Sequence, residues 1–201
     1  MNVVVVAASL GGVEAVGDVL SGLPADFPAA VLVVQHRTAA PDSLLEEILA
    51  RRTALRVKPG GDGEPISTGT VFVAPGGYHL LLDPDGLLRL SQSEKVRYVR
   101  PAADVLFESV AAHHKGRVVA VVLTGMDGDG SDGAVAVKEA GGYVIVQSPA
   151  TAEAPSMPIS ALSTGAVDEA IPLWGIAPAL VKRLTVNVTS DDHPRCRKAV
   201  L

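Results

Sequence analysis

Three side chains of the types that can together catalyse acyl transfer occur in this chain, and each comes after an apolar run typical of a buried strand. They are Ser9, His36 and Asp129, and the runs cover residues 3–8, 30–34 and 118–123. A serine hydroxyl is a weak nucleophile until a base removes its proton. An imidazole base in turn needs a carboxylate that fixes its tautomer and stabilises its cation. The spacing therefore predicts a serine nucleophile, a histidine base and an orienting aspartate.

Each of the three residues also has a structural explanation. Ser9 stands in the segment Ala-Ala-Ser-Leu-Gly-Gly, where a serine between a strand and a helix often binds phosphate or caps the helix. His36 could be a hydrogen-bonded histidine at a sheet edge, and Asp129 could cap the helix that follows it. Their shared position after strands favours the catalytic interpretation, because sites in parallel sheets form beyond the carboxyl ends of the strands.

Two other site chemistries fit the sequence poorly. A dinucleotide site would need glycine where Ala7 and Ser9 stand, and an acidic residue after the second strand, where the chain has Gln35 and His36. The stretch Asp-Gly-Asp-Gly-Ser-Asp from residue 127 resembles a calcium loop. Its twelfth position, however, is Lys138 rather than glutamate. Both alternatives are therefore disfavoured.

The order of the apolar runs predicts an α/β fold. Strands and helices alternate along most of the chain, which indicates right-handed crossovers and a doubly wound, mostly parallel sheet flanked by helices. Short strands around the turn Asp-Pro-Asp-Gly predict an antiparallel hairpin. Strands are expected at 3–8, 30–34, 56–58, 70–73, 79–82, 87–90, 118–124, 143–146 and 167–171. Helices are expected at 13–20, 42–51, 102–114, 133–140 and 177–184.

Composition narrows the class of protein. The chain has 201 residues, 48% of them hydrophobic, and a formal charge of −5 without a long run of one sign, so nucleic acid is not an expected partner. Cys196 is the one cysteine, which excludes an internal disulfide and favours a reducing compartment. The three apolar runs fall far short of the roughly 20 residues that a membrane span needs. We expect a cytoplasmic protein that does not insert into membranes.

With these residues in hand, the chain resembles the catalytic domain of the chemotaxis protein-glutamate methylesterases. The resemblance covers the serine turn, the Gln-His step and the Leu-Thr-Gly-Met-x-x-Asp-Gly segment. It also covers shorter motifs around residues 74–79, 100–107 and 157–158, so it spans nearly the whole chain. Several specific motifs in the same order make a chance likeness a poor explanation.

The resemblance implies a fold, an activity and residue roles. It implies hydrolysis of glutamate γ-methyl esters, and deamidation of glutamines, on the cytoplasmic helices of chemoreceptors. Ser9 would be the nucleophile, His36 the general base and then acid, and Asp129 the orienting carboxylate. The backbone N–H groups of Leu10 and Met126 would hold the oxyanion. No cofactor and no metal are implied.

The sequence departs from the family pattern at three positions. Ala7 replaces a glycine, Leu10 replaces a threonine, and Asp127 stands where the family usually has glycine. We expect a catalytic domain over residues 1–186 and a polar tail over 187–201. By the resemblance, family members usually also carry a receiver domain; we expect none within these residues, so either the chain is a piece of a longer protein or a separate receiver domain is a candidate regulator. Alternative functions are a receptor- or partner-binding module without catalysis and an esterase for small substrates.

Two expectations concern side chains around the site. Ser9 Oγ should lie within hydrogen-bonding distance of one ring nitrogen of His36, with Asp129 facing the other. Arg97 and Arg100 precede Pro101 and are the candidates for a positive substrate rim that faces acidic side chains of a receptor helix. His79, by contrast, is expected to have a structural role.

Overall fold

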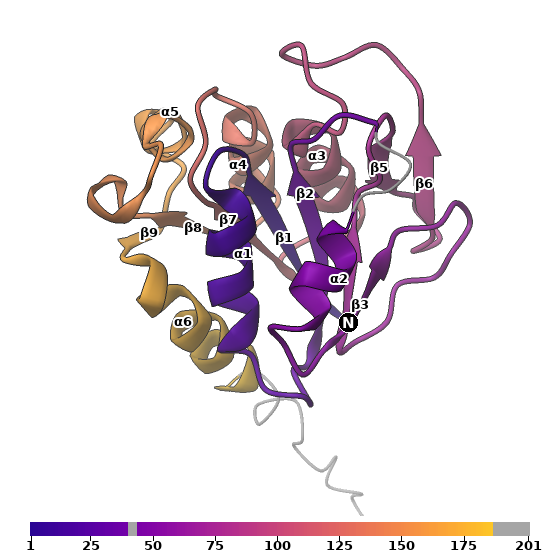
Figure 1. The fold of residues 1–201 in the computed structure, drawn as a ribbon, viewed down its shortest axis with the longest axis horizontal. Coiled ribbons are helices and arrows are strands. Elements are labelled where there is room, and N and C mark those ends of the chain that lie inside the picture. The colour runs from indigo at the N-terminus through magenta and orange to yellow at the C-terminus, as the bar shows by residue number, and fades with distance from the viewer. Residues whose placement is uncertain (40–43, 187–201) are drawn as a thin grey trace, which may run out of the picture.

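The computed structural model describes residues 1–39 and 44–186. Within this part of the chain, seven parallel strands form one sheet in the order β3-β4-β2-β1-β7-β8-β9 (Figure 1). The strands are β1 (Asn2–Ala8), β2 (Ala29–Gln35), β3 (Arg56–Pro59), β4 (Thr70–Val73), β7 (Val118–Val122), β8 (Tyr143–Gln147) and β9 (Glu169–Ile171). The doubly wound, mostly parallel sheet predicted from the sequence is confirmed.

The central strands are apolar at nearly every position, as expected where helices cover both faces of the sheet. On β1, Val3, Val5 and Ala7 belong to one hydrophobic core, and the alternate residues of the strand belong to the other. The first core includes residues of α3 (Ala103–His113), α4 (Ser131–Glu139) and α5 (Ser156–Ser163). The second includes residues of α1 (Gly12–Ser21), α2 (Leu45–Ala50) and α6 (Leu173–Val186). In Figure 1, α1 and α2 lie in front of the strands.

The predicted hairpin is confirmed as a separate two-stranded antiparallel sheet. It pairs β5 (His79–Leu82) with β6 (Leu88–Ser91), and Gly86 adopts a positive φ of 79° in the turn between them. Three leucines of the hairpin are buried against the core that α3 joins. The hairpin therefore packs beside the start of α3, which matters for the site described below.

The structure corrects the sequence prediction near the end of the chain. A short 3₁₀ turn (Pro149–Thr151) and α5 were not predicted, because the prolines and serines around 149–160 are typical of loops. Helix α6 begins at Leu173 rather than at 177 and contains Pro178 in its interior. The predicted start signal at residues 41–42 and the tail at 187–201 lie outside the described residues. No helix in the described ranges is long and apolar enough to cross a membrane.

Candidate active site

Ser9 and His36 leave the sheet side by side. Strand β1 lies between β2 and β7, with Ala8 opposite Gln35 in the register, so both residues follow paired positions. The backbone N–H of His36 donates to the Ala8 carbonyl at 2.9 Å, and that of Ser9 donates to the Thr124 carbonyl at 2.9 Å. The three strand ends that the sequence singled out are therefore neighbours at one edge of the sheet, in agreement with the predicted topology.

The turn after Ser9 is shaped by two glycines and one glutamine. Gly11 adopts a left-handed φ of 73°, a conformation that glycine reaches without steric cost. A Cβ on Gly12 would lie 2.1 Å from Oε1 of Gln35, whose Nε2 donates to the Ser9 carbonyl at 2.8 Å. Gln35 thus fills the space under the turn and fixes the backbone of the serine. Sequence reasoning noted the Gln-His step but did not identify this role.

Two backbone N–H groups beside Ser9 have no acceptor among the described residues. They belong to Leu10 and Met126, the residues that the resemblance assigns to the oxyanion. Gly125 brings the two segments together, since a Cβ there would lie 2.8 Å from Cβ of Ser9. Thr124 donates through Oγ1 to the Leu10 carbonyl at 2.9 Å, which ties the two segments to each other. Thr124 is a supporting residue that the sequence analysis missed.

Asp129 is a fully buried carboxylate with three donors around it. His36 Nε2 lies 2.6 Å from Oδ2 of Asp129, and the backbone N–H groups of Ala103 and Asp104 donate to its two oxygens at 2.5 and 2.9 Å. These N–H groups open α3, where the helix dipole favours an anion. Asp129 therefore does cap a helix, but the helix is α3 rather than the following helix α4. This N-terminus balances the cost of burying the charge.

A second carboxylate faces His36 from the same loop. Asp127 Oδ2 lies 3.2 Å from Nδ1 of His36, an ion-pair distance at which the angle does not meet hydrogen-bond geometry. Its Oδ1 accepts the backbone N–H of Asp129 at 3.0 Å. Burial alone would lower the pKa of His36, but Asp127 and Asp129 together raise it to about 9. Burial would likewise raise the pKa of Asp127, but its contacts with His36 and the Asp129 N–H lower it.

The expected hydrogen bond between Ser9 and His36 is not present. Ser9 Oγ makes no hydrogen bond to any of the described residues, and both ring nitrogens of His36 face aspartates. The prediction was wrong because it allowed for one carboxylate, whereas a charged imidazole prefers two carboxylates to one hydroxyl. The prediction that Asp129 faces a ring nitrogen agrees with the structure.

The two arginines expected at the substrate rim have different surroundings. Arg97 is part-exposed and donates to Asp104 at 3.2 Å and to Asp132 at 2.7 Å. Its guanidinium lies beside the backbone of Gly128, in the loop that carries Asp127 and Asp129, called the aspartate loop below. Arg100 donates to the carbonyls of Gln92 and Ser93 at 2.7 and 2.6 Å. Arg97 therefore lies next to the loop that carries Asp129. Arg100 instead stabilises the backbone of the segment that precedes it. The roles of both toward a substrate stay predictions.

Asp104 and His79 hold the start of α3, whose N–H groups bind Asp129. Asp104 accepts the Gly133 N–H at 2.8 Å, and its burial, together with the nearby Asp129 charge, raises its pKa to about 6. His79 is fully buried. Its Nδ1 accepts the Ala102 N–H at 3.2 Å, which leaves Nε2 to donate to the Glu94 carbonyl at 3.0 Å. The structural role expected for His79 agrees with these bonds, which hold the start of α3 against the hairpin.

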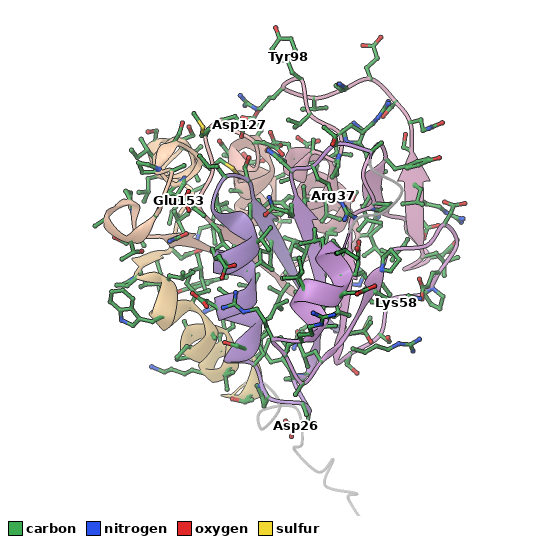
Figure 2. All side chains as sticks on the ribbon, in the orientation of Figure 1. Asp26, Arg37, Lys58, Tyr98, Asp127 and Glu153 are labelled. Carbon is green, nitrogen blue, oxygen red and sulfur yellow. The ribbon has the colours of Figure 1, made fainter. Side chains whose placement is uncertain are left out.

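Two hollows meet at Leu10 beside the serine. The first encloses about 380 Å³ and is lined by Ser9, His36 and the turn that begins α1, including Glu14. The second, of about 490 Å³, lies between Met126 and α5, with Glu153 at one side. Figure 2 labels Asp127 and Glu153 at the same end of the molecule, with Asp26 at the opposite end. The hollows give a substrate access to Ser9 from solvent.

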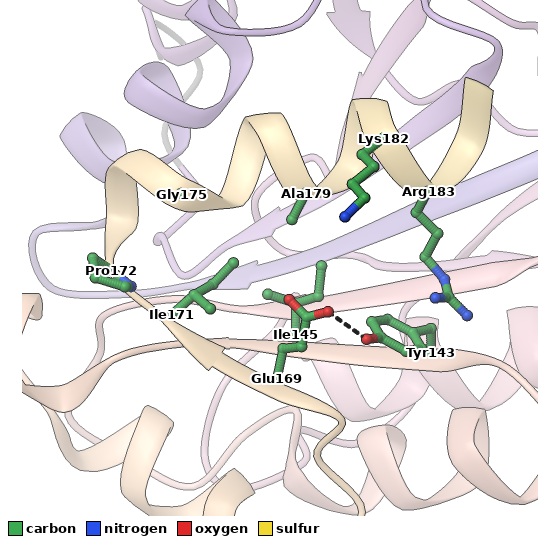
Figure 3. Close-up of a pocket in the computed structure, with 9 residues that line it drawn as sticks. All are labelled: Tyr143, Ile145, Glu169, Ile171, Pro172, Gly175, Ala179, Lys182 and Arg183. Carbon is green, nitrogen blue, oxygen red and sulfur yellow. Dashed lines mark hydrogen bonds between the residues drawn. The ribbon is translucent and has the colours of Figure 1, made fainter. Parts of the chain in front are cut away.

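A larger hollow lies elsewhere. It encloses about 610 Å³ between α6 and strands β8 and β9 (Figure 3). Three of its polar groups interact with one another: the Tyr143 hydroxyl donates to Glu169 at 2.5 Å, and the Arg183 guanidinium lies 3.3 Å from the centre of the Tyr143 ring. We therefore assign the candidate site by its chemistry rather than by its size. Within the described ranges, no cluster of three or more histidine, cysteine or acidic side chains is arranged to hold a metal ion.

Comparison with known proteins agrees with the geometry. Residues 4–180 match the family model described as CheB methylesterase. A protein-glutamate methylesterase/protein-glutamine glutaminase of Symbiobacterium thermophilum is 41% identical over 181 residues. The alignment covers 90% of this chain and 50% of that protein. A putative protein of the same description from Leptospira interrogans is 36% identical over 179 residues, which are 89% of this chain and 93% of that protein.

A solved structure extends the likeness to three dimensions. The crystal structure of the Thermotoga maritima CheB methylesterase catalytic domain superposes with a TM-score of 0.87 at 36% sequence identity, covering 90% of this chain and 98% of that one. The chain thus spans about half the length of the Symbiobacterium protein and nearly all of the Thermotoga domain. The match in sequence and the match in fold agree with the resemblance found from the motifs. This chain belongs to the CheB methylesterase family.

Proposed function

We propose that this protein is a serine hydrolase that removes methyl groups from glutamate γ-methyl esters on the cytoplasmic helices of chemoreceptors. Deamidation of glutamine side chains there is the same reaction with ammonia as the leaving group. The observation that carries the proposal is that Ser9, His36 and Asp129 lie together at one edge of the sheet. Ser9 lies beside two backbone N–H groups that have no acceptor among the described residues, and His36 next to it is 2.6 Å from the buried Asp129. The names of the family and of the relatives supply the substrate class.

The chemistry follows from the roles of these groups. Ser9 Oγ attacks the ester carbonyl carbon while His36 takes the hydroxyl proton, and the Leu10 and Met126 N–H groups hold the resulting oxyanion. His36 then gives the proton to the departing methoxide, which leaves as methanol. The acyl group stays on Ser9 as an acyl-serine. Water attacks this acyl group in the reverse sequence and releases the glutamate carboxylate. Asp129 orients the imidazole and stabilises its cation throughout.

We also propose how the protein meets its partners. A receptor methylation helix is rich in glutamate, whereas this chain carries a net charge of −5 and has Glu14 and Glu153 beside the hollows. Arg97 is the part-exposed cation next to the aspartate loop, and with Arg100 it forms the proposed substrate rim. A receiver domain supplied separately is the proposed regulator, and the cytoplasm, where the receptor helices lie, is the proposed site of action.

A binding module without catalysis is the second candidate, and one observation favours it. Ser9 Oγ is not bonded to His36, whose two nitrogens both face carboxylates. Release of methanol from a methyl-esterified receptor fragment separates the two candidates. The first requires release that depends on Ser9, and the second predicts binding of the fragment with no release by either the wild type or Ser9→Ala.

A further inference from the structure

His36 lies between two carboxylates that differ in how firmly they are held. Asp129 is fully buried and accepts two N–H groups of α3, so it cannot leave the imidazole without exposing the start of that helix. Asp127 is half-buried, with 32% of its side chain exposed. Its only hydrogen bond in the described part of the chain comes from the Asp129 backbone N–H, and Arg97 adds an electrostatic attraction. The pairing with Asp127 is therefore the one that can open.

The paired arrangement is unsuited to the first step of acyl transfer. An imidazole that presents N–H groups to two carboxylates has no lone pair with which to accept a proton. Ser9 Oγ correspondingly has no hydrogen bond in the described structure, although Ser9 and His36 line the same hollow. For His36 to act as a base, one nitrogen must lose its proton and turn from its carboxylate toward the serine.

We propose that Asp127 is a positioning residue that holds His36 in this doubly paired, non-basic state, and that catalysis at Ser9 requires release of Nδ1 from Asp127. This inference rests on the function proposed above and adds a control on it. Nε2 stays on Asp129 in both states, so the orienting pair is kept.

The charged groups around His36 define the direction of the pH effect. Asp127 and Asp129 face the ring from the loop before α4, and Asp104 at the start of α3 lies behind Asp129. Arg97, in the segment before α3, lowers the pKa of Asp127 through its positive charge. Glu14 of α1 lines the hollow that Ser9 and His36 share. With the pKa of His36 raised to about 9, the ring is a cation at neutral pH. Lowering the pH does not make His36 a base, because the ring keeps its proton. Raising the pH, or removing the Asp127 carboxylate, makes a neutral ring available.

The test compares the wild type with Asp127→Asn and Asp127→Gly. The matched control is Asp26→Asn, which removes the same charge at the opposite end of the molecule (Figure 2). One readout is the pH profile of kcat/KM for p-nitrophenyl acetate from about pH 6 to about pH 10. The other is the NMR titration of the His36 ring in a Ser9→Ala background, which does not depend on catalysis.

We expect the wild-type profile to rise toward pH 9 and the His36 ring to titrate there. In both Asp127 variants the rise and the ring titration should move down by at least about one pH unit, which makes kcat/KM at pH 7 roughly tenfold higher. The control should match the wild type. Two results would overturn the proposal: a ring titration at the same pH with and without Asp127, or a lower rate at every pH with an unmoved profile. The second would show that Asp127 serves only to support the loop.

The two proposals fail in different ways. If the wild type hydrolyses no ester at any pH and Ser9 is not modified by a serine-reactive reagent, the proposed function is wrong. The ring titration in the Ser9→Ala background would then still show whether Asp127 restrains His36. If hydrolysis depends on Ser9 but the titration of His36 ignores Asp127, the function stands and this inference is withdrawn.

Discussion

His36 and Asp129 form a pair in which Nε2 of the imidazole lies 2.6 Å from Oδ2 of a carboxylate with no exposed surface. The same carboxylate accepts the first N–H groups of α3. The pair therefore joins the end of β2 to the start of a helix far away in sequence. One aspartate both orients the proposed base and anchors the helix beside it.

The double role of Asp129 predicts two effects of Asp129→Asn. Turnover of a methyl-esterified receptor fragment should fall by on the order of 10⁴-fold, by analogy with serine proteases. The free energy of unfolding should also fall by about 1–3 kcal/mol, because a neutral amide replaces a charged acceptor at the helix N-terminus. Asp127→Asn, measured beside it by steady-state kinetics and urea unfolding, is the matched comparison. If Asp127→Asn causes the larger loss of turnover, Asp129 is not the orienting carboxylate.

Gly12→Ala should destabilise the turn that carries Ser9. The new Cβ would lie 2.1 Å from Oε1 of Gln35 and 2.7 Å from Cβ of Ala8, so the glutamine must leave the Ser9 carbonyl. We expect a loss of about 1–3 kcal/mol in urea unfolding, together with weaker labelling of Ser9 by a fluorophosphonate. Gly175→Ala in α6 is the control, since its Cβ would meet only ordinary contacts at 3.8 Å. A change in stability no worse than that of the control would show that Gln35 does not support the turn.

The raised pKa of His36 predicts a pH-dependent loss of stability on the alkaline side. The folded state holds the proton up to about pH 9, whereas the unfolded chain releases it near the ordinary value of about 6.5. The contribution is therefore complete below about pH 6.5 and is lost as the pH rises through 9, by roughly 3–4 kcal/mol at most. Urea unfolding of the wild type and His36→Gln across this window measures it. Parallel pH curves for the two proteins would show that His36 is not the group responsible.

The proposed substrate rim predicts a salt-sensitive effect on KM. Arg97→Ala should raise KM for an acidic receptor fragment and leave p-nitrophenyl acetate hydrolysis nearly unchanged. Added salt should shrink the difference because exposed charges are screened within roughly 10 Å at 0.1 M ionic strength. Arg100→Ala should have the smaller effect of the two, since its guanidinium is bonded to the Gln92 and Ser93 carbonyls. Receptor kinetics unchanged in the double variant would remove both arginines from substrate binding.

The sequence predicted the sheet and the positions of the three candidate residues because both follow from local patterns. Apolar β-branched runs define the buried strands, and residues placed after such runs meet at one edge of a parallel sheet. The segments that were missed, α5 and the first turn of α6, lack such a pattern: Pro158 lies in α5, and Pro178 lies in the interior of α6. In α6 tertiary packing outweighs the low helix propensity of proline, whereas Pro158 lies in the first turn of α5, where its missing N–H removes no hydrogen bond within the helix.

What could not be predicted at the site depends on contacts between distant segments. Nothing local indicates that Asp129 accepts N–H groups of α3, or that Gln35 fills the space below Gly12. The sequence marked Asp127 only as a departure from the family pattern. Its distance from His36 depends on how the loop after β7 folds over the end of β2. For the same reason the Ser9–His36 hydrogen bond was expected where the structure has a second carboxylate.

The most direct test of the central claim is covalent labelling with a fluorophosphonate, followed by mass spectrometry of the peptide that carries Ser9. The reagent reacts with a serine whose hydroxyl is activated by a base and whose oxyanion is stabilised. The account predicts one adduct, on Ser9, that is faster at pH 9 than at pH 7 because the His36 pKa is about 9. Labelling should be lost in Ser9→Ala, a variant expected to unfold within about 0.5 kcal/mol of the wild type because Ser9 Oγ makes no hydrogen bond in the described structure. No adduct at either pH, or an adduct on a different serine, would contradict the assignment of Ser9 as the nucleophile.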